Sequence, residues 1–255
     1  QDEESALKAL RAGKIESMAS VSPEGAKALA SEGRTVLSSP EQRLYGVFFN
    51  QTQAPIFADK AVRTALATTV DRARIMNEVF YSYATPLEGP IPPGILGYTP
   101  EAVPVAVTEE DIDAARKALE VGGWKFDTTR NVFTKKDKKG TTELHFTIAT
   151  RIIPELKAIA EILKESWARV GVSVDVSYFD EGDLRETIIR PRKYEALLFG
   201  GVFPSESALY SFWHSSQRND PGYNITMYTN STVDKILEKV YSTTEQATRE
   251  KGYKQ

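Results

Sequence analysis

The sequence predicts an α/β fold with a mixed, largely parallel sheet flanked by helices. One observation is the strand, helix and strand that follow one another over residues 143–178, because short connections of this kind give a right-handed crossover and parallel pairing. Another is the helical segment at 183–190, which leads into a short apolar strand at 194–199. The rest of the chain supplies amphipathic helices, with no repeat and no low-complexity tract.

The composition is that of a soluble globular protein with one large domain or two small ones. The chain has 255 residues, of which 41% are hydrophobic, and a net charge of −3 from 32 basic and 35 acidic residues. This balance excludes a general nucleic-acid or anionic-membrane binder. Cysteine is absent, which excludes disulfides, a thiolate zinc site and a cysteine nucleophile. No apolar run reaches the roughly 18 residues of a membrane span.

The first quarter of the chain predicts two short helices and a strand. Residues 3–12 form an amphipathic helix that a glycine ends. Ser22 and Pro23 open a second helix, because serine caps and proline is preset for the first turn, and Gly33 closes it. The aromatic run at 43–50 predicts a buried strand.

Helices and one proline-rich loop fill the next part of the chain. Residues 59–80 predict two linked helical pieces, the second capped by Asp71. The four prolines between 86 and 93 predict a stiff loop packed on the protein, with a linker as the alternative. Thr108 and Asp111 form a capping box. The helix that it opens has a predicted buried stripe of Ile112, Ala115, Leu119 and Val121.

The second half carries the α/β pattern. The lysine-rich stretch at 135–140 predicts a hairpin tip, because no aromatic residues interleave the lysines as in a nucleic-acid patch. Pro154 opens the crossover helix and Gly171 ends it. Gly200-Gly201 is expected to end the regular pairing of the strand at 194–199, and Ser231 is expected to cap a last helix.

The sequence contains no recognisable catalytic or cofactor signature. It lacks the nucleophile-elbow, P-loop and dinucleotide motifs, so no cofactor is expected. His145 falls on the polar face of a strand, and the two histidines lack zinc-ligand spacing, so no metal is expected. Glycoside hydrolysis needs only two carboxylates across a cleft, so this class stays open without positive evidence.

Five stretches, in the same order and spacing, resemble the dipeptide and oligopeptide class of extracellular solute-binding proteins, family 5, which serve ABC transporters. They are ALRAGKIE at 9–16, FADKAVRTALATTVDRARIMNEVFYSYATPLEGPIPPG at 57–94, DIDAARKALEVGGW at 111–124, ELKAIAEILKESWARVGVSVDV at 155–176, and YSFWHSSQRNDPGYNITMYTNSTVDKIL at 210–237.

The resemblance implies a periplasmic-binding-protein-like lobe, from a protein in which two hinged lobes close on a ligand. It implies that residues 1–43 end a first-lobe segment and that 44–255 form most of the second lobe, cut short at its C-terminus. It also implies a periplasmic or extracellular monomer, with a lipid anchor left open, that binds without chemistry and docks on ABC permease subunits. The alternatives are an oligosaccharide-binding or ligand-sensing protein on the same scaffold, or a hydrolase.

The loop after the strand at 194–199 is the predicted binding wall, because ligands of open α/β sheets sit past the carboxyl ends of strands. Some peptide-binding members carry tryptophan and an acidic residue there. This chain instead has Gly201 and, further on, Glu206 as the loop's one carboxylate, so a ligand amino terminus depends on Glu206. The candidate ligand-binding residues are Phe199, Gly201, Phe203, Ser205, Glu206, Trp213, His214 and Asn224.

Overall fold

A computed structural model describes residues 2–39, 43–100, 106–138, 140–203 and 205–255. Its centre is a four-stranded sheet in the order β1-β7-β5-β6. The middle strand β5 is parallel to both β6 and β7, whereas β1 is antiparallel to β7, which confirms the mixed α/β fold. The four strands are β1 (Arg43–Phe49), β5 (His145–Arg151), β6 (Ser173–Phe179) and β7 (Ala196–Val202).

The predicted crossover joins β5 to β6 through the longest helix, α6 (Pro154–Val170). Proline stands in its first turn, where the missing amide proton costs nothing. Gly171 ends the helix at a φ of +95°, a left-handed conformation that glycine adopts without strain. The crossover prediction is therefore confirmed.

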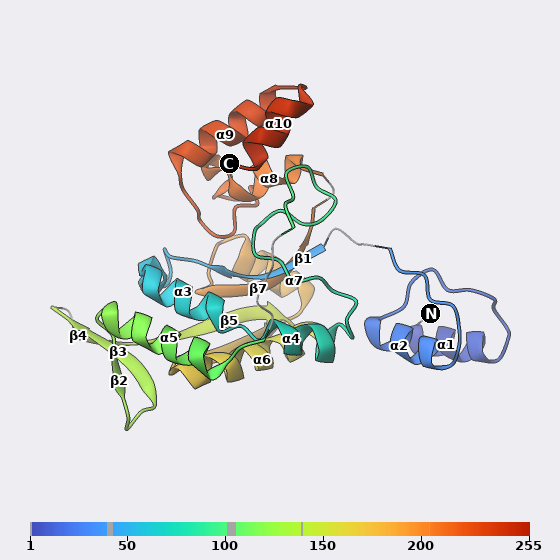
Figure 1. Cartoon of the computed structure of the whole chain (residues 1–255), viewed down its shortest axis with the longest axis horizontal. Helices are drawn as coiled ribbons and strands as arrows, with labels where there is room; N and C mark the ends of the chain where they lie inside the picture. The colour runs from blue at the N-terminus through green and yellow to red at the C-terminus, as the bar shows by residue number, and fades with distance from the viewer. Residues whose placement is uncertain (1, 40–42, 101–105, 139, 204) are drawn as a thin grey trace.

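One face of the sheet is covered by α6 together with α3 (Lys60–Thr68) and α5 (Glu109–Val121), as Figure 1 shows. Aromatic side chains dominate the cluster between them: Phe57 lies 4.9 Å from Phe146 and Trp167 lies 5.6 Å from Phe146, measured between ring centroids. The capping box of α5 is confirmed. Val121 was wrongly placed in the buried stripe: it is 84% exposed, because two residues beyond Leu119 the side chain points to the opposite face of the helix.

Two further groups of elements lie around the central sheet. The opposite sheet face carries α7 (Glu181–Asp183) and the π-helical turn η3 (Leu184–Ile189), over a smaller cluster that includes Leu184, Tyr194 and Leu197. A separate antiparallel sheet holds the predicted lysine-rich hairpin. It consists of β2 (Lys125–Asp127), β3 (Val132–Asp137) and β4 (Gly140–Glu143).

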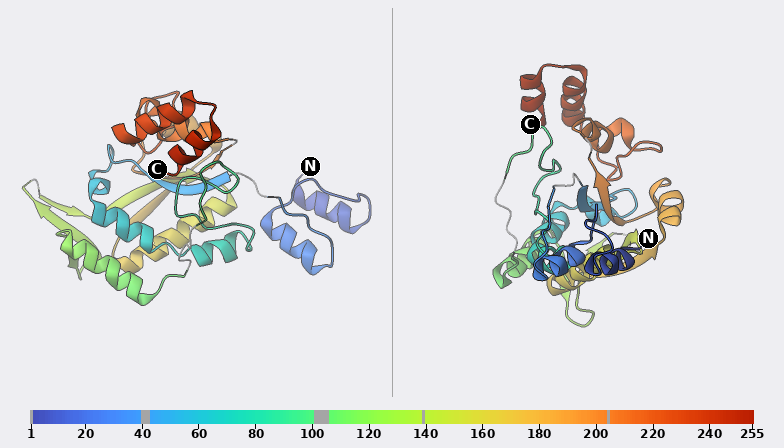
Figure 2. Two further views of the ribbon diagram at one scale, coloured as in Figure 1. Left: turned by 45° about the horizontal axis from the view of Figure 1, so that its top comes forward. Right: turned by 90° about the vertical axis from the view of Figure 1, so that its right-hand side faces the viewer.

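Residues 2–39 contain a helical pair that stands to one side of the sheet (Figures 1 and 2). The pair consists of α1 (Glu3–Arg11) and α2 (Pro23–Ser31), with the predicted Ser22 cap in place. Its side-chain links include a 2.6 Å hydrogen bond from Ser22 Oγ to a Glu3 carboxylate oxygen. Between β1 and α5 the chain adds η1 (Pro55–Ala58), α4 (Arg72–Arg74) and the π-helical turn η2 (Ile75–Val79).

Two expectations about strands are wrong. Gly200 and Gly201 do not end the pairing of β7, which continues opposite β1 as far as Val202, although its parallel pairing with β5 stops at Leu198. The strand β1 is not a buried strand, because it lies at the sheet edge and only Phe48 in it is buried. An edge strand has one neighbour, so its residues keep partial exposure.

Residues 205–255, which we call the C-terminal layer, pack above the β1–β7 side of the sheet (Figures 1 and 2). Its apolar cluster contains Leu209 and Leu237 with Phe203 of the preceding strand end. The sequence did not predict α8, and the expected Ser231 cap of α9 is in fact Asn230, whose side chain accepts from Thr232 and Val233 amides. The helices are α8 (Ser207–Trp213), η4 (Ser215–Gln217), α9 (Ser231–Ser242) and α10 (Gln246–Tyr253).

Candidate functional site

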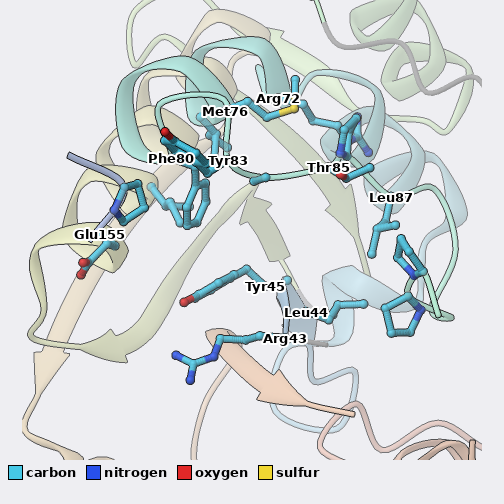
Figure 3. Close-up of a pocket in the computed structure, with 18 of the residues that line it drawn as sticks. Arg43, Leu44, Tyr45, Arg72, Met76, Phe80, Tyr83, Thr85, Leu87 and Glu155 are labelled. Carbon is cyan, nitrogen blue, oxygen red and sulfur yellow. The ribbon is translucent and has the colours of Figure 1, made fainter. Parts of the chain in front are cut away.

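A large open pocket of about 2320 Å³ lies between the N-terminal helical pair, the start of β1 and the proline-rich loop. Its lining reaches the carboxyl edge of the sheet, since Arg43 pairs with Val202 at the end of β7 and Glu155 follows the end of β5. Figure 3 shows Arg43, Tyr45 and Glu155 around this space. The carboxyl edge is where open α/β sheets hold ligands.

Aromatic side chains form one wall of the pocket. Tyr45 lies on the same face of β1 as Arg43, because side chains alternate along a strand. The Tyr45 ring packs 5.2 Å from the Phe80 ring and across Gly200, where an added Cβ would lie 2.8 Å from a ring carbon. Gly200 is therefore needed for close approach of the ring, and the wall depends on it.

The half-buried carboxylate of the pocket lining, among the described residues, is Glu155 in the first turn of α6. Glu155 lies near the positive end of the helix dipole because it stands in the first turn, and the N-cap residue of α6, Ile153, provides no side-chain hydrogen bond. Throughout the described ranges the Glu155 carboxylate has no hydrogen-bond or ion-pair partner. Arg43, in contrast, has an interaction partner of its own.

Of the eight residues that the sequence predicted, Trp213 lines this pocket and the other seven lie elsewhere in the same part of the fold. Phe199 is half-buried beside the cluster on the far face of the sheet, and Gly201 is buried beneath the Phe212 ring. Phe203 is 1% exposed and stacks on Phe212 at 4.5 Å. The Phe203 side chain is therefore packed in the interior and does not face the pocket.

The loop carboxylate Glu206 is already paired. Its side chain forms an ion pair with Arg249 of α10, and its backbone oxygen accepts a hydrogen bond from the Tyr253 hydroxyl. A hydrogen bond with Tyr253, the Coulomb attraction of Glu206 and the other contacts raise the pKa of Arg249 above its usual value. Ser205 is bonded to the Ser207 hydroxyl at 2.6 Å. Pro204, between Phe203 and Ser205, lies outside the described residues.

His214 and Asn224 belong to a buried polar network beneath α9. Asn224 is fully buried and donates to the backbone oxygens of His214 and Tyr228 at 3.1 and 2.9 Å. The Ser216 amide donates to His214 Nδ1, which leaves the ring proton on Nε2, 3.4 Å from a Glu238 oxygen. These hydrogen bonds hold the loops around His214 and Asn224 in place.

Asp234 of α9 ties this network to η4. It accepts from the Ser215 amide at 2.9 Å and the Ser215 hydroxyl at 2.7 Å. Burial alone would raise the pKa of Asp234, but these hydrogen bonds and the nearby His214 ring lower the pKa below its ordinary value. The carboxylate is therefore ionised wherever the layer is folded near neutral pH.

Sequence reasoning missed Tyr45, Phe80 and Glu155 as site residues. The first two belong to runs that predicted core packing, and Glu155 lies in the predicted crossover helix, where an acidic residue in the first turn gives no signal of a ligand. Among the residues that the structure describes, no group of three or more His, Asp or Glu could hold a metal ion. Nor, in those ranges, does any helix have the length and apolar character to cross a membrane.

The chain belongs to the family described as bacterial extracellular solute-binding proteins, family 5 middle, whose model matches residues 1–220. A curated relative is the oligopeptide-binding protein AppA of Bacillus subtilis, 28% identical over 78% of this chain and 36% of that protein. Heme-binding protein A of Haemophilus influenzae is 25% identical over 82% of this chain and 36% of that protein.

The solved structure of Bacillus subtilis AppA in complex with a nonapeptide has the same fold. Its TM-score is 0.76 at 24% identity, covering 99% of this chain and 50% of that one. The chain therefore spans about a third of the length of the curated relatives and half of the solved structure that it matches.

Proposed function

We propose that the protein is the substrate-binding component of an ABC importer, which captures a peptide or another small solute between two lobes and delivers it to a membrane permease. Family membership over residues 1–220 is the observation that carries this proposal. Residues 44–255 would be most of one lobe and residues 1–43 the end of a segment of the other. The protein would act outside the cytoplasm, as a monomer and without catalysis.

The pocket supports a binding role. It lies at the junction of the helical pair and the carboxyl edge of the sheet, so a solute there would touch both parts of the chain. A ligand that contacts both parts favours the closed arrangement by its differential affinity, and closure gives the permease a recognisable form.

The nature of the solute is open between a peptide and other small molecules. AppA is named for oligopeptides and its relative in Haemophilus influenzae for haem. The side chains of Tyr45, Phe80 and Trp213 suit an apolar side chain or a sugar ring equally, so an oligosaccharide-binding or sensing protein is the second candidate.

Ligand-induced thermal stabilisation of the full-length protein tests the proposal. We expect one class among tripeptides, oligosaccharides and haem to raise the melting temperature, since a ligand at about 100 times its dissociation constant stabilises by about 2.7 kcal/mol. Turnover of any of these molecules would contradict the proposal. Residues 1–255 alone should bind far more weakly, because one lobe offers part of the contacts.

A further inference from the structure

We propose that Glu155 is the carboxylate that receives a cationic group of the solute, with the Tyr45 and Phe80 rings forming the wall beside that group. This inference rests on the proposed function, because it places the solute in the pocket of Figure 3. It moves the expected cation site from Glu206, in the loop after β7, to the first turn of α6.

The pairing of the two carboxylates argues for this exchange. Glu206 is bound to Arg249, so a ligand ammonium group would have to displace an existing guanidinium. Glu155 has no such competitor among the residues that the structure describes. A half-buried carboxylate without a partner has lost part of its hydration and has gained no hydrogen bond or ion pair in return. An incoming cation would compensate for the lost hydration.

The other charged side chains of the pocket differ from Glu155 in pairing or in exposure. Three of its guanidinium groups are bonded to backbone carbonyls of their own surroundings: Arg34 to Leu10, Arg63 to Phe57 and Arg72 to Ala67. The other carboxylates of the lining, Glu16 and Glu88, are exposed. Glu155 thus combines partial burial, a free carboxylate and adjacent aromatic rings.

The Tyr45 and Phe80 rings give a second reason, separate from the carboxylate, to expect a cationic group. Figure 3 shows Tyr45 extending from β1 toward the side of the pocket that holds Glu155 and Phe80. The faces of aromatic rings carry partial negative charge and attract ammonium or guanidinium groups within about 6 Å. Ring faces and carboxylate therefore favour the same sign of ligand charge.

Two features oppose a cation there, and neither outweighs the carboxylate. The N-terminus of α6 carries the equivalent of about half a positive charge, which offsets only part of the full charge on Glu155. Arg43 extends toward the same side of the pocket but already interacts with another residue. If these two features dominated, the pocket would select an anion, and the experiment separates the two results.

The first experiment measures calorimetric affinities of the full-length protein for three probes: tri-alanine with a free amino terminus, its N-acetyl form and its N-succinyl form. We expect a preference of at least about tenfold for the free amine, which Glu155→Gln abolishes, because a hydrogen bond between charged groups contributes that much. Glu161→Gln removes the same charge from the same helix outside the pocket and should keep the preference. A preference for the succinyl form, or one that survives Glu155→Gln, overturns the proposal.

A second measurement does not depend on peptide binding. Titration of n-butylammonium into ¹³C-labelled full-length protein should shift the Glu155 carboxylate and Tyr45 ring resonances, and n-butanol should not. If this shift occurs while no peptide binds, the Glu155 site stands and the peptide form of the proposed function fails. If butylammonium leaves the Glu155 resonance unmoved, the proposal is wrong even where peptides bind.

Discussion

The central core and the C-terminal layer are held together by different interactions. In the core, the sheet and α3, α5 and α6 bury a single large cluster of apolar side chains. In the layer, the apolar cluster is small, and polar groups such as the buried Asn224 and the half-buried Asp234 connect its loops and helices. The stability gained from apolar burial depends on how well side-chain volume fills the core. The stability gained from a polar network depends on the chemical identity of each hydrogen-bond partner.

This difference predicts which substitutions each region tolerates. The core should absorb conservative apolar substitutions at modest cost, and lose much stability only when a large side chain is removed. The layer should respond to the loss of single polar atoms, and it should respond locally. The following predictions, from the largest effect to the smallest, test that division.

Trp167→Ala should have the largest effect on the free energy of unfolding. The indole is 1% exposed, packs on Phe146 and donates to the Leu66 backbone oxygen at 3.0 Å. Removing it should cost about 3–5 kcal/mol, measured by urea unfolding. Val121→Ala, at an exposed position of α5, should change stability by less than about 0.5 kcal/mol. Equal effects of the two variants would remove the distinction between core and surface.

Asn224→Ala should cost about 2–3 kcal/mol, because the buried His214 carbonyl and the part-buried carbonyl and amide of Tyr228 lose their partner. Hydrogen exchange should show lost amide protection around residues 214–228 while the protection of β5 and α6 persists. The exposed Asn219→Ala is the matched control. Protection lost uniformly across the whole chain would contradict a locally held layer.

Gly200→Ala tests the strand β7 that joins the two regions. The new methyl group would lie 2.8 Å from the Tyr45 ring, so the ring must move, at a cost of roughly 1–2 kcal/mol. The matched variant Gly46→Ala meets its nearest neighbours at 3.6 Å or beyond and should cost less. Chemical denaturation of both variants decides the point, and a lower stability of Gly46→Ala would show that crowding at Tyr45 is not the cause.

Asp234→Asn should have the smallest effect, roughly 1 kcal/mol at neutral pH. The folded pKa of Asp234 lies below its ordinary value of 3.8, so its contribution is complete above that value and is lost as the pH falls through the folded pKa. The difference between wild type and variant in free energy of unfolding should therefore be constant from pH 7 to about 5 and shrink below 3.8. A difference that grows on acidification would exclude this role.

The sequence predicted the core well because periodicity reports burial. The alternation in β5 and the three-and-four spacing in α6 follow directly from strand and helix geometry. The errors have separate causes. Val121 lies two positions beyond Leu119, about 200° around the helix, and therefore on the opposite face of α5 from the buried stripe. Gly200-Gly201 was interpreted as a break, although β1 provides a neighbour across it.

The candidate site was less predictable than the fold. Glu206 looked free in the sequence because its partner Arg249 lies 43 positions further along the chain. Tyr45 and Glu155 come from different elements, and only the pairing of β1 with β7 and the start of α6 bring them to one pocket. Local patterns report which face a residue occupies, but the partner across a pocket comes from the tertiary fold.

The placement of the tryptophans gives the protein an optical signal of its own. The sequence contains three tryptophans, of which Trp124 and Trp167 are 3% and 1% exposed within the core. Trp213 alone is half-buried, and it faces Tyr228 at the pocket wall. A solute that enters the pocket would change the surroundings of the Trp213 indole and leave Trp124 and Trp167 buried in the core. Intrinsic tryptophan fluorescence would therefore report whether the pocket is occupied, without an added dye.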